Sequence, residues 1–235
     1  MLKKLLKLFL PPILIKIYSY FKNYQKRRYI NNPNTLFYGD DSLFKKEIMS
    51  SKLYGEYGCG KSTKWVLNNT RCTVISVDAS IEWITEVKND NTNNNKRLNI
   101  HYSDLGDLEG WGRPKSYLKH NNFLDYTNYL WTQTEKPDLV LVDGRFRVCC
   151  FLTSLKFANE GTKILFDDYL NRPYYHFVEK YISHIEECGS QCLFIVPSKL
   201  SIDMNSLDKD IERFRFVMEW SIEIRIIGEK IFNKD

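Results

Sequence analysis

Short apolar segments that alternate with amphipathic ones are the feature that most constrains the fold of this 235-residue chain. Leu139–Val142 is a continuous apolar run, which is typical of a strand that is buried on both faces of a sheet. Strands of this kind, separated by helices, favour an α/β fold with a mostly parallel sheet and helices on both faces. Hydrophobic residues make up 43% of the chain, which is enough for a core and excludes a wholly disordered protein. The expected strands are Lys52–Tyr57, Thr73–Val77, Leu98–Tyr102, Leu139–Val142, Lys163–Phe166 and Cys192–Val196, and the expected helices are Thr63–Leu67, Ser80–Lys88, Phe146–Ala158 and Tyr174–Ile185.

Positive charge is concentrated at the N-terminus. Residues 1–28 contain eight of the 34 basic side chains and no acidic one, which leaves 26 basic and 29 acidic residues in the remainder. The remainder is therefore slightly acidic, and we expect no nucleic acid among its partners. The longest uncharged run of the leader, Leu8–Ile15, is too short to cross a bilayer, and no small-residue cleavage site of a signal peptide follows it.

The leader instead has the composition of a membrane-surface anchor. Its leucine, isoleucine and phenylalanine residues are interleaved with lysines, and each lysine near an anionic lipid surface contributes about 1 kcal/mol of attraction. The alternative is a helix that packs on the body and keeps its lysines in solvent. We divide the chain into a basic amphipathic leader, 1–30, and one folded domain, 31–235, and expect a cytoplasmic protein that is peripheral on the inner face of the membrane.

The six cysteines have no spacing that marks a disulfide scaffold or a zinc site. Six in 235 residues are few, and no two of them form a CxxC pair. The sequence therefore predicts reduced thiols in a cytosol and no structural zinc.

The glycine-rich segment YGEYGCGKST, at 54–63, admits two interpretations. In the first, Gly55-x-x-x-x-Gly60-Lys61-Ser62 is a Walker A loop. Backbone N–H groups would then surround phosphates, Lys61 would contact the β- and γ-oxygens, and Ser62 would bind magnesium.

In the second interpretation, Glu56-x-Gly58-x-Gly60 ends the first strand in a tight turn that a nucleoside cofactor can approach closely. An acidic residue is then expected about 20 residues later, at the end of the second strand, to bind ribose hydroxyls. Asp78 fits this position, and Asp104 follows the third strand, where it could bind a ring amine. We favour this interpretation because the Walker A alternative leaves only a very short apolar strand before the loop and gives Asp78 no role.

Five segments in order, EYGCGKST, VISVDASIEW, SDLGDLEGWGRP, DLVLVDGRFRV and ILFDDYLNRPYY, resemble the motifs of class I S-adenosylmethionine-dependent methyltransferases. The resemblance implies a seven-stranded Rossmann-like sheet and S-adenosylmethionine as the cofactor. It further implies that Glu56, Gly58 and Gly60 surround the methionine part, that Asp78 binds the ribose, and that Asp104 lies near the adenine.

Three aspartates follow two neighbouring strands of the expected sheet. Asp143 ends the strand LVLVD, and Asp167 and Asp168 end ILFDD. Because neighbouring strands lie about 4.8 Å apart, these carboxylates are expected to converge, and carboxylate oxygens suit Mg²⁺. The arrangement resembles metal-dependent O-methyltransferases, in which acidic residues follow the fourth and fifth strands. The alternatives are a helix-capping role for Asp143 and an ordinary ion pair between Asp167 and a nearby arginine.

Arg145 and Arg147 alternate in DGRFR and would point the same way in an extended segment. Arginine suits bidentate binding of carboxylate or phosphate, which makes an acidic or phosphate-bearing acceptor a hypothesis. The alternative is a salt bridge to one of the aspartates. His176 follows the fifth strand and is a candidate general base, although a lone histidine is more often structural.

The sequence thus predicts a methyltransferase that acts on a glycan, nucleotide-sugar or small-molecule hydroxyl. Asp143, Asp168, His176 and Arg145 are its candidate catalytic residues, and Asp143, Asp167 and Asp168 are its candidate metal ligands. Two alternatives remain open: a P-loop nucleotide kinase or NTPase that uses Lys61, and a non-catalytic methyltransferase-like domain that binds a nucleoside.

Overall fold

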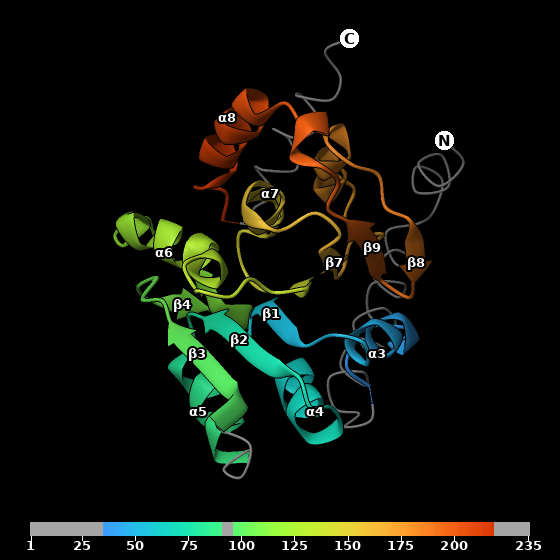
Figure 1. Cartoon of the computed structure of the whole chain (residues 1–235). Coiled ribbons are helices and arrows are strands. Elements are labelled where there is room, and N and C mark those ends of the chain that lie inside the picture. The colour runs from blue at the N-terminus through green and yellow to red at the C-terminus, as the bar shows by residue number, and fades with distance from the viewer. Residues whose placement is uncertain (1–34, 91–95, 219–235) are drawn as a thin grey trace, which may run out of the picture.

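The computed structural model describes residues 35–90 and 96–218 as one α/β unit (Figure 1). The predicted membrane-surface leader lies outside the described residues, so the structure does not bear on it. Among the described residues, no helix combines the length and the apolar character that crossing a membrane requires.

The centre of the unit is a seven-stranded sheet with the order β3-β2-β1-β6-β7-β9-β8. Its first five strands are parallel, whereas β9 runs antiparallel to both of its neighbours. The strands are β1 (Leu53–Tyr57), β2 (Thr73–Asp78), β3 (Leu98–Tyr102), β6 (Leu139–Val142), β7 (Lys163–Phe166), β8 (Glu186–Cys188) and β9 (Gln191–Ile195), and a separate small hairpin pairs β4 (Leu108–Glu109) with β5 (Arg113–Pro114). The mostly parallel sheet that the sequence predicts is confirmed.

Helices cover both faces of this sheet, as the sequence predicts (Figure 1). One face packs against α3 (Ser42–Ile48), α4 (Lys61–Asn69) and α5 (Ile81–Asp90), and the other against α6 (Phe123–Asn128), α7 (Arg147–Phe157), α8 (Met204–Phe214) and the 3₁₀ segment η5 (Pro173–Lys180). Short 3₁₀ turns complete the described chain at η2 (Gly110–Gly112), η3 (His120–Asn122), η4 (Tyr129–Trp131) and η6 (Lys199–Ser201).

The alternation of side chains along each strand builds two separate cores. In β6, Val140 and Val142 join the core under α7, whereas Leu139 and Leu141 join the core under α3 and α4. All four side chains are buried, which explains why the run is continuously apolar. Truncating Leu141 to alanine is expected to cost about 2–5 kcal/mol of stability.

The predicted elements differ from the structure mainly after β7. The helix expected over Tyr174–Ile185 is a 3₁₀ segment that stops at Lys180, because the following chain is extended and the N–H of Ile185 donates to the carbonyl of Leu193 at 2.8 Å. The last strand pairs antiparallel because a tight turn through Gly189, at φ +59°, joins it to β8. The helices α3, α6 and α8 were not expected from the sequence.

Candidate functional site

A tight turn after β1 lies at the carboxyl edge of the sheet. Gly58 has a φ of +93°, and its N–H donates to the carbonyl of Val77 on β2 at 2.9 Å. A Cβ atom at Gly58 would lie 2.9 Å from the Cα atom of Gly144, which follows β6. Only glycine combines this conformation with this close approach. The second glycine, Gly60, precedes α4, and a Cβ atom there would meet no described atom within 4 Å.

Glu56 fixes this turn from inside the sheet. Its carboxylate is fully buried and accepts hydrogen bonds from Tyr54 Oη and Ser62 Oγ, both at 2.9 Å, and from Thr63 Oγ1. Thr63 Oγ1 in turn accepts from the N–H of Gly60 at 2.9 Å. Burial raises the pKa of Glu56 to about 7. Glu56 therefore positions the start of α4, and its predicted contact with a cofactor stays a prediction.

The Walker A alternative does not fit this geometry. Gly55 is not part of a loop but lies inside β1, paired with Ile75 and Val140. A Cβ atom at Gly55 would lie 2.7 Å from the ring of Pro137, so this glycine is required by packing. The hydroxyl of Ser62, which would bind magnesium in a phosphate loop, is buried on Glu56. The segment is therefore a strand followed by a two-glycine turn.

Asp78, at the end of β2, connects the glycine turn to the start of α5. Its Oδ2 atom accepts from the N–H of Cys59 at 2.8 Å, and its Oδ1 atom accepts from the N–H of Ser80 at 2.7 Å. Burial raises the pKa of Asp78. Asp78 thus lies beside the turn, as the nucleoside interpretation requires, and its contact with a ribose stays a prediction.

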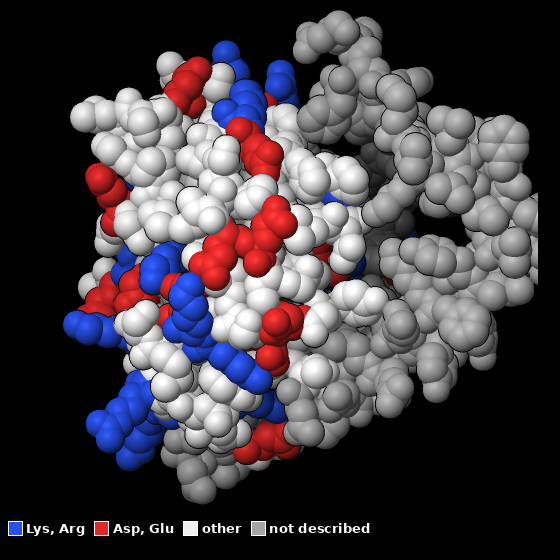
Figure 2. Space-filling model, turned by 90° about the vertical axis from the view of Figure 1, so that its right-hand side faces the viewer, with Lys and Arg blue, Asp and Glu red and all other residues white. Residues whose placement is uncertain are grey.

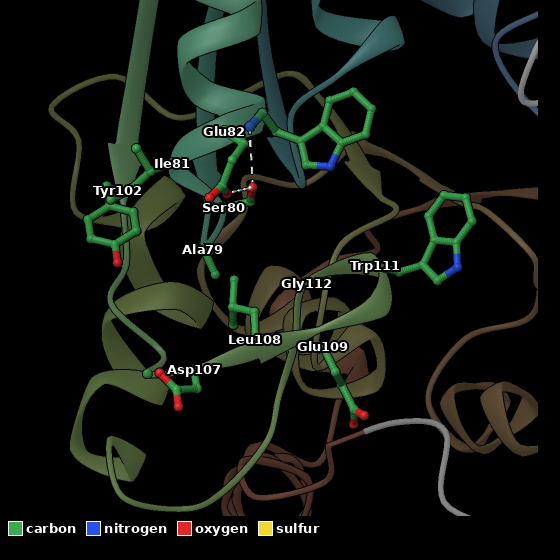
Figure 3. Close-up of a pocket in the computed structure, with 12 residues that line it drawn as sticks. Ala79, Ser80, Ile81, Glu82, Tyr102, Asp107, Leu108, Glu109, Trp111 and Gly112 are labelled. Carbon is green, nitrogen blue, oxygen red and sulfur yellow. Dashed lines mark hydrogen bonds between the residues drawn. The ribbon is translucent and has the colours of Figure 1, made fainter.

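A hollow of about 510 Å³ begins at Ala79, the residue after Asp78, and lies between the carboxyl ends of β2 and β3 (Figure 3). One wall is the segment that leads into α5, and the other is the loop after β3, including the β4–η2 turn. The volume lies in the range of small-molecule sites. The lining residues are Ala79, Ser80, Ile81, Glu82, Trp83, Tyr102, Gly106, Asp107, Leu108, Glu109, Trp111 and Gly112.

Asp104 begins the loop that forms the second wall. Its carboxylate accepts from the N–H of Gly106 and pairs with Lys119 Nζ, both at 3.0 Å. The hydrogen bond from Lys119 is the main cause that lowers the pKa of Asp104. The carboxylate therefore orders the loop, and its predicted contact with adenine would require Lys119 to move or to be shared.

The three predicted aspartates lie around one arginine. The guanidinium of Arg147, only 4% exposed, donates to Asp143 Oδ1 at 2.8 Å and approaches Asp168 Oδ2 at 3.5 Å. It also donates to the carbonyls of Asp143, Gly144 and Asp167, at 2.9, 3.1 and 2.7 Å respectively. Arg147 thus occupies the space between the strand ends.

A magnesium ion does not fit this arrangement. The only three metal-binding side chains within 4.8 Å of one another in the described part of the chain lie elsewhere. Asp167 is buried and accepts from Ser190 Oγ at 2.8 Å, and burial raises its pKa far above that of an ordinary carboxyl. Burial raises the pKa of Asp143 as well, whereas Arg147 lowers it. The predicted Mg²⁺ site at these aspartates is therefore not supported, because an arginine already provides the positive charge.

Arg145 and Arg147 do not lie in an extended segment, which is the condition on which their predicted common direction depends. The backbone turns at Phe146, whose φ is +52°, and Arg147 becomes the first residue of α7. Arg145 is 8% exposed, and its buried Nη1 atom has no hydrogen-bond partner among the described residues. Its positive charge nevertheless acts on Asp143, whose pKa it lowers. A buried arginine with an unused donor beside a carboxylate is a candidate anion-binding group.

Asp168 has a second arginine partner. Arg172 Nη2 contacts Asp168 Oδ2 at 2.5 Å, and its Nη1 atom donates to Tyr175 Oη at 2.9 Å. The spacing of four residues between Asp168 and Arg172 is the sequence signal for this ion pair.

His176 lies apart from these carboxylates in its described contacts. Its Nε2 atom is 3.2 Å from the carbonyl oxygen of Tyr169, and its ring packs on the ring of Tyr169 with centroids 4.7 Å apart. A carbonyl oxygen only accepts, so Nε2 carries the proton in this contact. The geometry gives His176 a structural role, and its predicted role as general base has no support.

The sheet order and the glycine turn beside the acidic end of β2 define an α/β protein of the Rossmann-like class. No protein-family model and no curated protein matches the chain. Among solved structures, it is 30% identical to a methyltransferase-like protein from Silicibacter pomeroyi, with a TM-score of 0.67 over 74% of this chain and 92% of that one.

Two O-methyltransferases show weaker likeness. The enzyme from Bacillus cereus, solved with S-adenosylhomocysteine, has 16% identity and a TM-score of 0.47 over 65% of this chain and 77% of its own. TomG from Streptomyces achromogenes, solved with S-adenosylmethionine, has 15% identity and a TM-score of 0.48 over 66% and 77%. The identity to the Silicibacter protein over most of both chains shows the family: the chain belongs to the class I S-adenosylmethionine-dependent methyltransferases.

Proposed function

We propose that this chain transfers a methyl group from S-adenosylmethionine to a hydroxyl of a small-molecule acceptor that carries an anionic group, such as an acidic glycan or a nucleotide sugar. The observation that carries the proposal is the hollow that begins at Ala79, directly after Asp78, at the carboxyl ends of β2 and β3. Its place at the carboxyl edge of the sheet is where ligands of open α/β sheets bind.

In this proposal, the two parts of the cofactor lie at two neighbouring places, the hollow and the glycine turn. The nucleoside would occupy the hollow, with its ribose hydroxyls on Asp78. The methionine part would lie along Gly58 and Gly60, where the missing side chain at Gly60 leaves open space. S-adenosylmethionine supplies an electrophilic methyl group, and this chain's own residues must position the acceptor and take its proton.

Asp143 is the candidate group for the proton. Its side chain is 34% exposed, so one oxygen can meet an acceptor while the other stays on Arg147. Burial raises the pKa of Asp143 and Arg147 opposes this rise, and a carboxylate with a raised pKa is a stronger base for the hydroxyl proton as the new oxygen–carbon bond forms. Arg145 would bind the anionic group of the acceptor through its unused donors.

Calorimetry on the full chain tests the cofactor part of this proposal. S-adenosylhomocysteine should bind to the wild type, and Asp78→Asn should weaken binding at least tenfold, because a good hydrogen bond to a charged group contributes about 1.5–3 kcal/mol. Asp208→Asn, on α8 and outside the proposed site, is the matched control and should leave binding unchanged. Binding of ATP in place of S-adenosylhomocysteine would contradict the proposal.

An acceptor panel tests the chemical step. Neutral and acidic sugars are compared with the wild type, Asp143→Asn and Arg145→Gln. We expect Asp143→Asn to lower turnover by about 10²–10⁴-fold, the usual contribution of a general base. Arg145→Gln should raise KM for acidic acceptors and leave neutral ones unchanged. Cofactor binding without turnover on any member of a broad panel would favour the non-catalytic alternative.

The N-terminal leader is the basis of a proposed location. We infer that residues 1–28 bring the domain to an anionic membrane surface, because they carry eight basic side chains and no acidic one. Flotation with phosphatidylserine-containing vesicles should retain the full chain and release a chain that begins after residue 28. Equal flotation of both would remove the anchor from the proposal.

A further inference from the structure

A second group of polar side chains lies at the far edge of the sheet, away from the glycine turn. His184, Glu187 and Cys192 each offer one metal-binding atom, and these atoms all lie within 4.8 Å of one another. Glu187 of β8 is directly opposite Cys192 of β9 in the antiparallel pair, so their side chains share one face. The hairpin itself therefore brings a carboxylate and a thiol together.

His184 is already oriented for such a role. Its Nε2 atom is 2.8 Å from Glu187 Oε1, and its Nδ1 atom is 2.8 Å from Glu179 Oε1. Glu179 also accepts from Tyr169 Oη at 2.9 Å. A histidine that binds a metal through one nitrogen usually donates the other N–H to a carboxylate, which fixes the ring. Glu179 provides that second carboxylate.

We propose that His184 Nε2, Glu187 and Cys192 bind one thiophilic divalent cation, with Zn²⁺ as the best fit, and that Glu179 positions His184 as its partner outside the ligand set. The mixed nitrogen, oxygen and sulfur donors match Zn²⁺ and not Mg²⁺ or Ca²⁺, which prefer oxygen alone. Tetrahedral zinc with these donors separates its ligand atoms by roughly 3.3–3.8 Å. Binding must therefore open the 2.8 Å contact between His184 Nε2 and Glu187 Oε1 and shorten any separation near the 4.8 Å limit.

The surroundings admit a cation from solvent. Cys192 is buried, whereas the side chains of His184 and Glu187 are 28% and 50% exposed. Figure 2 turns the side of the molecule that carries β8 and β9 in Figure 1 toward the viewer, and acidic side chains gather near the middle of its described surface. A cysteine binds a metal as the thiolate, so binding releases the Cys192 proton to solvent as the sulfur–metal bond forms.

This site revises the expectation of no structural zinc. The prediction rested on the absence of a CxxC pair, but the ligands here come from three residue types and meet only through the β8–β9 hairpin. The cation would join the end of η5, through Glu179, to that hairpin. Its action is independent of methyl transfer, because none of these residues belongs to the proposed cofactor or acceptor site.

Titration of the chelator-treated full chain with Zn²⁺ alone tests the proposal. We expect one ion per chain and a higher melting temperature. Cd²⁺ should add an ultraviolet thiolate-to-metal absorption band, which reports Cys192 directly. Failure of the wild type to bind Zn²⁺, or binding without a thiolate band for Cd²⁺, would overturn the site.

Two matched pairs of variants locate the ion. Glu187→Gln should weaken Zn²⁺ binding at least tenfold, whereas Glu186→Gln, next to it on the opposite face of β8, should leave it unchanged. Cys192→Ser should remove the Cd²⁺ band, whereas Cys188→Ser should retain it. Glu179→Gln should weaken binding about 10- to 100-fold, as loss of such a partner usually does. Because Glu187 is exposed, its variant tests the site even if Cys192→Ser fails to fold; unchanged affinity in Glu187→Gln would refute the proposal.

Discussion

Arg147 gives the sharpest test of the geometry at the strand ends. Its guanidinium makes four hydrogen bonds of 2.7–3.1 Å, one of them to the carboxylate of Asp143, in a site where the arginine is 4% exposed. In Arg147→Met, three carbonyls and a largely buried carboxylate lose their donor while the apolar stem is kept. Removing one partner of a buried ion pair typically costs about 3–5 kcal/mol. Against a total stability of about 5–15 kcal/mol, this is a severe loss.

The stability that is lost in Arg147→Met depends on whether Asp143 is charged. A double-mutant cycle can measure this dependence. In Asp143→Asn the arginine keeps its carbonyl partners, so we expect a smaller cost of about 1–3 kcal/mol. The double variant Asp143→Asn/Arg147→Met should be more stable than the sum of the single losses predicts, by about 1–3 kcal/mol, because no unpaired charge remains.

Urea unfolding at pH 7, followed by circular dichroism, measures all four proteins. Lys163→Met, which removes the ion pair between Lys163 and Glu47 on another part of the sheet, is a control that should not couple to Asp143. Additive losses, within about 0.5 kcal/mol, would show that the two groups do not interact as described and would refute the reasoning.

Three other outcomes follow from the site. Gly58→Ala should destabilise the fold, since its Cβ would approach Gly144 to 2.9 Å at a φ of +93°, whereas Gly60→Ala should leave the melting temperature unchanged and weaken S-adenosylhomocysteine binding in calorimetry. Burial raises the pKa of Glu56 from 4.5 to about 7, so the folded state holds this proton more tightly; its contribution, on the order of 3 kcal/mol, is complete below pH 4.5 and is lost as the pH rises to 7. Unfolding of Glu56→Gln should therefore depend less on pH across this window than that of the wild type, and equal pH dependence would count against the assignment. Methyl transfer should persist in EDTA, since Arg147 occupies the predicted metal position, and strict dependence on Mg²⁺ would contradict that conclusion.

The sheet was predictable because its signals are local. Leu139–Val142 is apolar at every position, and Asp78 follows a β-branched strand at the spacing that a nucleoside site requires. Both features depend only on the period of a strand and the length of one crossover. The same reasoning placed Asp143, Asp167 and Asp168 at adjoining strand ends, where the structure has them.

What surrounds these aspartates was not predictable in the same way. The position of Arg147 depends on the left-handed turn at Phe146, which no sequence rule assigns to a phenylalanine. The Walker A interpretation of 54–63 was wrong for a related reason. The order of residues in this segment does not reveal that Gly55 lies inside β1 and packs against Pro137. The neighbourhood of His184 and Cys192 likewise depends on tertiary pairing.

Trp83 and Trp111 both line the hollow and are 40% and 60% exposed, whereas Trp131 is buried in the core. Indole emission changes when a ring passes from water to contact with another aromatic system. A purine that binds in the hollow would therefore quench the intrinsic tryptophan fluorescence of the protein. Dissociation constants could then be measured by fluorescence without any label, and Trp111→Phe would remove the part of the signal that Trp111 contributes.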